Sequence, residues 1–174
     1  MANNLNQIME TLLNQETLSN ISKNSGVSSD EVAKVLASAL PKLLDGASAQ
    51  SSNEKTAAGF AQALEDHSGA DLSSLSNFFN KIDLGDGAKI VQHLLGKDAD
   101  DVKEKTSKSS GINTTAVSAI LACAAPLLMS TLGKQAKSKK KKDSNDSLAA
   151  LAGQLLGGGD AMDVIGALGS LLKK

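Results

Sequence analysis

Apolar residues recur along this chain at the spacing of an amphipathic helix, and the same pattern occurs twice. Positions three and four residues apart share one face of a helix, so each stripe predicts a long helix with one buried side. The first stripe comprises Val32, Val35, Leu36, Ala39, Leu40, Leu43 and Leu44, and the second comprises Val117, Ile120, Leu121, Ala124, Ala125, Leu128 and Leu132.

The two copies align without a gap, which indicates a duplicated structural unit. Gly26 falls on Gly111, and each predicts the end of a short helix, because glycine readily adopts the left-handed conformation found there. Ser28 and Glu31 predict a capping box at the start of the first long helix. Asn113 takes the cap position in the second copy. Each unit is therefore predicted to be a short helix, a glycine turn and a long helix, over about 3–45 and 86–132.

Pro41 and Pro126 occupy matching positions within the two stripes. Each removes a helical hydrogen bond, to Ala37 or Ala122, and crowds that carbonyl. We predict a kink in both long helices. A freed carbonyl that binds a ligand is the alternative, and the continuation of both stripes past the prolines favours the kink.

The remaining segments predict further helices. An amphipathic stretch runs from Asn3 to Asn14, and a short helix covers about Glu16 to Ser25. In the interlude, 46–85, we predict a loop over Ala47 to Asn53 and then two helical faces, the second capped by Asp71. The two faces comprise Ala57, Phe60, Ala61 and Leu64, and then Leu72, Leu75, Phe78 and Phe79. A helix after Gly85 that stops at Gly96 and a charged helix over about Ala99 to Ser109 complete a domain predicted to span 1–133.

A run of lysines followed by Asp-Ser-Asn-Asp-Ser predicts a flexible linker over 134–147. The tail, 148–174, is apolar and rich in glycine, and it predicts two short helices separated by Gly157 to Gly159. Its apolar residues are the candidate interaction site: Leu151, Leu155, Leu156, Val164, Ile165, Leu168, Leu171 and Leu172.

Composition favours an all-α multihelical bundle. The 174 residues include only three phenylalanines and no tyrosine or tryptophan, and no segment alternates as a strand does. No charge interrupts Ser109 to Gly133, but its strongly apolar part, Ala116 to Met129, has the length of a buried core helix rather than a membrane span. We therefore place the second long helix at the centre of the fold.

The charges weigh against nucleic-acid binding. Every basic side chain is lysine, and the net charge is −1. Arginine supplies the planar fork that reads guanine and grips phosphate. The short helix, turn and long helix resemble a helix-turn-helix, but Asp30 and Glu31 would place negative charge against DNA phosphates. The lysine run could still bind nucleic acid or anionic lipid, although a solvated linker is the commoner role.

Candidate chemistry is sparse, and we expect neither catalysis nor a metal or cofactor. His67 and His93 lack a second histidine or cysteine at metal-ligand spacing. We interpret His67 as part of a solvated helix end and His93 as the polar edge of its helix, and a general base is the alternative for either. Cys123 lies in the most apolar stretch, where we expect a buried, inert thiol. The N-terminus lacks the pattern of a signal peptide, so we expect a cytoplasmic protein.

The repeated pattern Gly-[Val/Ile]-x4-Val-x3-Leu-Ala-x-Ala-x-Pro-x-Leu, together with the Leu-Leu-Gly-Gly-Gly tail, resembles the bacterial YidB-like family of unknown function. The resemblance covers nearly the whole chain and implies a bacterial, all-helical protein. It carries no activity, cofactor or site residue.

These observations favour a non-catalytic helical module that binds another protein or a second copy of itself. The alternative is a peripheral membrane protein that uses the lysine run and the apolar tail.

Overall fold

The amphipathic stripes of the sequence form helices that bury their apolar faces against one another. The computed structural model describes residues 2–140, and over this range it contains helices and no strand. The elements are α1 (Ala2–Leu13), α2 (Gln15–Ser25), α3 (Ser29–Ser52), α4 (Ala57–Ser68), α5 (Leu75–Asn80), α6 (Leu84–Leu95), a 3-10 turn (Gly96–Asp98), α7 (Ala99–Ser110) and α8 (Thr114–Lys140). The all-α fold class is therefore confirmed.

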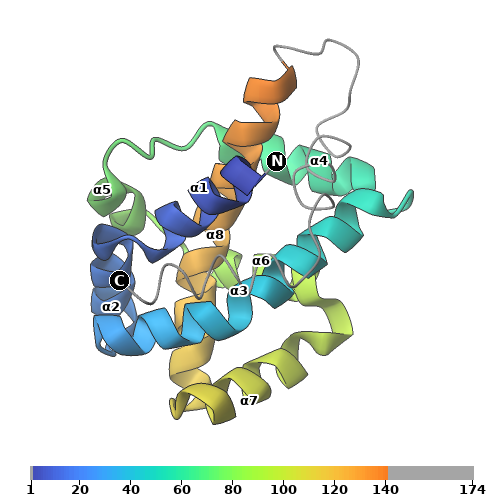
Figure 1. The fold of residues 1–174 in the computed structure, drawn as a ribbon. Coiled ribbons are helices and arrows are strands. Elements are labelled where there is room, and N and C mark those ends of the chain that lie inside the picture. The colour runs from blue at the N-terminus through green and yellow to red at the C-terminus, as the bar shows by residue number, and fades with distance from the viewer. Residues whose placement is uncertain (1, 141–174) are drawn as a thin grey trace.

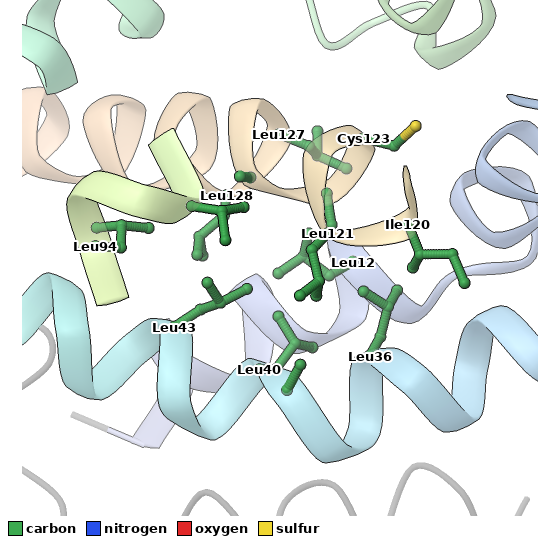
Figure 2. Packing of buried hydrophobic residues seen from close by; sticks show 14 of the residues in the cluster. Leu12, Leu36, Leu40, Leu43, Leu94, Ile120, Leu121, Cys123, Leu127 and Leu128 are labelled. Carbon is green, nitrogen blue, oxygen red and sulfur yellow. The ribbon is translucent and has the colours of Figure 1, made fainter. Parts of the chain in front are cut away.

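Helix α8 runs through the middle of the bundle, as its nearly continuous apolar sequence predicts (Figure 1). It packs against α1, α2, α3, α4, α6 and α7. Its segment Thr114–Ser138 is long and apolar enough to cross a membrane, but 89% of its most apolar window is buried inside the protein. The apolar surface of α8 is thus used by the core. Figure 2 shows this packing, with Ile120, Leu121 and Leu128 of α8 facing Leu36, Leu40 and Leu43 of α3.

The two glycine turns have nearly the same local geometry. Gly26 has φ 75° and ψ 15°, and Gly111 has φ 74° and ψ 16°. In both turns the glycine N–H donates to the carbonyl of the serine four residues earlier, at 2.9 Å. The hydroxyl of that serine, Ser22 or Ser107, donates to the carbonyl just after the glycine. Each preceding short helix, α2 or α7, packs on both long helices. Superposition of the two whole units stays a prediction.

Ser28 caps α3 as the sequence predicts. Its hydroxyl accepts from the Glu31 N–H at 3.3 Å, and its N–H donates to the Glu31 carboxylate at 2.8 Å. These hydrogen bonds from Ser28 lower the pKa of Glu31. In the second unit Asn113 accepts from the Ala116 N–H at 2.8 Å.

We expect Ser28→Ala to lower the free energy of unfolding by about 1 kcal/mol, the usual cost of losing an N-cap side chain. Urea unfolding at neutral pH measures the loss, and an unchanged midpoint would contradict it. Because the pKa of Glu31 is lowered in the folded state, its contribution is present above its unfolded pKa and is lost as pH falls through the folded value. The difference between Ser28→Ala and the parent should therefore shrink in acid.

Three predicted boundaries need correction. Helix α3 continues through Ala47 and Ser51, which are both buried, so the predicted loop over 47–53 is helix as far as Ser52. Helix α5 begins at Leu75 with Ser74 as its cap, whereas Asp71 accepts hydrogen bonds from Ser73. Helix α8 passes Gly133 and buries Ala136, so the predicted linker is helical over 134–140.

Candidate binding groove

Two neighbouring open cavities lie beside α8, the first lined by α4 and α6 and the second by α4, α5 and α6. The first has a volume of about 340 Å³ and the second about 480 Å³. Their linings share His67 and Asp86, and we call the two neighbouring cavities together the α4–α6 groove. Apolar side chains line much of the first cavity (Phe60, Ala63, Ile90, Leu94 and Met129) and part of the second (Ala70, Phe78, Ile82 and Pro126).

Two glycine contacts hold the walls of the groove on α8. A Cβ atom at Gly87 would overlap the carbonyl oxygen of Ala122, and one at Gly133 would overlap the carbonyl oxygen of Leu64. Helix α6 therefore lies directly on α8 at Gly87, and α4 lies directly on α8 at Gly133. Ala122 is four residues before Pro126, so its carbonyl lacks the usual helical donor. Because α6 covers this carbonyl, it is not the exposed ligand-binding group of the alternative interpretation.

The groove brings together two histidines that are far apart in the sequence. His67 comes from the end of α4 and His93 from the end of α6, and both line the first cavity. His67 is half-buried, whereas His93 is exposed. Their sequence context gave no reason to pair them, because each stands alone at the polar edge of its helix. Within residues 2–140, no group of three or more His, Cys, Asp or Glu side chains could hold a metal ion.

Carboxylates around the second cavity also organise the backbone. Asp83 caps α6 by accepting from the Gly85 N–H at 2.8 Å. Asp71 accepts from the N–H of Ser73 at 2.9 Å and from its hydroxyl. These hydrogen bonds lower the pKa of Asp71, and the positive charges of Lys134 and Lys81 lower it further. Asp71 is therefore ionised at neutral pH and adds negative charge at this end of the groove.

Two further sequence predictions concern aromatic and thiol side chains. Phe79 is buried in the core as expected, but Phe78 is only half-buried and lines the second cavity. The two rings meet edge to face, with centroids 5.4 Å apart. Cys123 is buried, and burial raises its pKa to about 11. Its thiol therefore stays protonated at neutral pH, which removes the nucleophilic form.

The predicted tail site lies outside the described residues. This applies to Leu151, Leu155, Leu156, Val164, Ile165, Leu168, Leu171 and Leu172. Among the described residues, Leu84 is the one exposed large hydrophobic side chain, at 40% exposure. The sequence did not predict the groove. Its apolar lining residues belong to the same helical stripes as the core residues, so the pattern does not distinguish them.

Comparison with known families now identifies the chain. Residues 7–135 match the model of a family described as a bacterial protein of unknown function (DUF937). The chain belongs to this family. The match spans both glycine turns and nearly all of the described helices, and it is consistent with the YidB-like resemblance. A search of curated proteins and a search of solved structures each gave no match.

Proposed function

We propose that this DUF937 protein is a non-catalytic helical module that binds another protein or a second copy of itself. The observation that carries the proposal is the α4–α6 groove, with its partly apolar floor and its rim of charged and imidazole side chains. A groove of this kind suits an amphipathic helix, whose apolar face fills the floor while its polar edges meet the rim.

The surroundings of the groove support binding over chemistry. The described surface exposes one large hydrophobic side chain, Leu84, whereas the groove presents the half-buried apolar side chains of Phe78, Ile82 and Ile90. Cys123, the strongest nucleophile by residue type, is buried and protonated. Neither histidine has a hydrogen-bonded carboxylate partner among the contacts of the described residues, so the arrangement of a base with an orienting group is missing there.

Gly59 offers a direct way to block the groove. It lines the first cavity on α4, and an added Cβ would meet nothing within 4 Å. Gly59→Arg should therefore fill the groove without disturbing the fold. Ala58→Arg is the matched control, because Ala58 is exposed on the same turn and does not line either cavity.

The test is amine cross-linking of the full chain in bacterial lysate, followed by identification of adducts by mass spectrometry. We expect Gly59→Arg to remove specific adducts, either with a partner protein or with a second copy, and Ala58→Arg to retain them. If the same adducts form in the parent and in both variants, the groove is not the binding surface.

Peripheral membrane binding is the second candidate. The observation that favours it is the basic end of α8, where Lys134 and Lys137 begin the lysine run. Clustered lysines attract anionic lipid headgroups at about 1 kcal/mol each. Flotation with anionic vesicles at low and high salt separates the two functions. Salt-sensitive flotation that survives Gly59→Arg would favour the membrane over the groove.

Removal of the tail gives a further prediction. A chain that ends at Lys140 contains every buried residue of the described core, the last of which is Ala136. We expect it to fold, with helical circular dichroism and cooperative unfolding, but to differ from the full chain in association state or in partner binding. An unfolded product would instead make the tail part of the core. A folded product with unchanged association and binding would remove the tail from the function.

A further inference from the structure

We propose that the resting occupant of the α4–α6 groove is the C-terminal segment of the same chain, residues 160–174. This inference rests on the groove being the binding surface proposed above. It adds that the module covers its own site, so that a partner must displace the segment.

The sequence of this segment has the spacing of a groove-binding helix. Val164, Leu168 and Leu171 fall at positions i, i+4 and i+7, with Ile165 and Leu172 beside them. A helix placed in a groove is anchored by residues at this spacing. The apolar contacts would supply most of the affinity, because exposed ion pairs contribute only about 0–1 kcal/mol.

Charge favours one direction of binding. The segment begins with Asp160 and Asp163 and ends with Lys173 and Lys174. The first cavity has Lys89 and two histidines together with Asp66 and Asp86, whereas the second has Lys81 and His67 together with Asp71, Asp83 and Asp86. The second cavity is therefore the more acidic of the two, so the lysine end of the segment fits it better, which leaves the acidic start at the first cavity.

The distance from the end of α8 to the groove decides between the same chain and a second copy. Met129 and Pro126 line the groove, and α8 ends at Lys140. At about 1.5 Å per residue, the end of α8 is roughly 17–21 Å beyond them. Between α8 and the segment, 148–156 form the first predicted tail helix, which spans roughly 14 Å. The ten remaining residues of 141–159, taken as flexible chain, add a root-mean-square span of roughly 17 Å, so the whole connection spans roughly 22 Å.

The match between span and distance favours docking within the chain. A flexible linker gives the highest effective concentration when its root-mean-square length matches the gap, and that concentration reaches the millimolar range. At micromolar protein concentration, the segment of a second copy is about a thousandfold more dilute than the tethered segment, so the segment of the same chain occupies the groove.

The experiment uses an equal mixture of full chains in normal and nitrogen-15 form, treated with an amine cross-linker. Peptide masses then separate links within one chain from links between two. We expect Lys173 and Lys174 to link to Lys81 more than to Lys89, within one chain. Gly59→Arg should abolish this preference, and Ala58→Arg should keep it. Hydrogen exchange over 160–174 should become faster in Gly59→Arg and stay unchanged in Ala58→Arg.

Other outcomes would overturn this inference and are distinguishable from failure of the proposed function. Predominant links between normal and labelled chains would assign the groove to a second copy. If the cross-links of Lys173 and Lys174 and the hydrogen-exchange rates over 160–174 are the same in Gly59→Arg as in the parent, the segment binds elsewhere. Vesicle flotation that requires residues 160–174 would then assign it to lipid. If partner adducts are still lost in Gly59→Arg, the proposed function holds although the segment does not occupy the groove. If partner adducts are also unchanged in Gly59→Arg, both the proposed function and this inference are wrong.

Discussion

Leu121→Ala is expected to lower the free energy of unfolding by roughly 2–5 kcal/mol, the range for truncation of a buried leucine. Leu121 is fully buried in α8, and it lies in the same packed layer as Leu12 of α1 and Leu40 of α3 (Figure 2). Because the side chains around it come from different helices that also contact other neighbours, the cavity cannot close by the movement of one element. The cost should therefore include a cavity term as well as the lost transfer free energy.

Ser138→Ala is the control for this substitution. Ser138 is exposed on the same helix, and its hydroxyl donates only to the Lys134 carbonyl of its own helix, at 3.0 Å. We expect a change close to zero, because alanine is also the better helix former. Denaturant unfolding of both variants gives the comparison. Equal losses in the two would contradict the position of Leu121 at the centre of the core.

The helices and their caps were largely predictable because their determinants are local. Gly26 and Gly111 both adopt the left-handed conformation that ends a helix, and Ser28 forms the predicted capping box with Glu31. The apolar pattern of α8 also predicted its position at the centre of the bundle, because a helix that is apolar around most of its circumference is buried by other helices on all sides. These features depend on neighbours within four residues or on one helix face.

Two helix ends were not predictable because tertiary packing overrode the local composition. The Ser- and Asn-rich stretch after Asp45 is typical of a loop, yet Ala47 and Ser51 continue the buried face of α3. Gly133 followed by lysines is typical of a stop, yet α8 continues because Gly133 lies against α4 and Ala136 is buried. Each extension depends on a partner helix that the local pattern does not reveal.

The groove depends on the same kind of long-range information. His67 and His93 share a cavity only because α4 and α6 both pack beside α8. That arrangement requires close helix crossings at glycines, including Gly46 against the Leu94 carbonyl. A glycine within a helix is recognisable in the sequence, but the element that lies against it is not.

Gly87→Ala is the second substitution with a large expected effect. The added methyl group would overlap the Ala122 carbonyl oxygen, which belongs to the backbone of the central helix and cannot rotate away. Helix α6 would have to move off α8, opening contacts along the groove wall. Overpacking of this kind costs about 1–3 kcal/mol, occasionally more, and should exceed the gain of roughly 1 kcal/mol that alanine brings in helix propensity.

Gly59→Ala makes the same chemical change on α4, where the new Cβ meets nothing within 4 Å. There the propensity gain is unopposed, so the free energy of unfolding should rise by about 0.5–1 kcal/mol. The two variants are thus expected to change stability in opposite directions, and thermal and urea unfolding under identical conditions measure both. A stabilised Gly87→Ala protein would show that α6 does not lie directly on α8, and the walls of the α4–α6 groove would have to be placed differently.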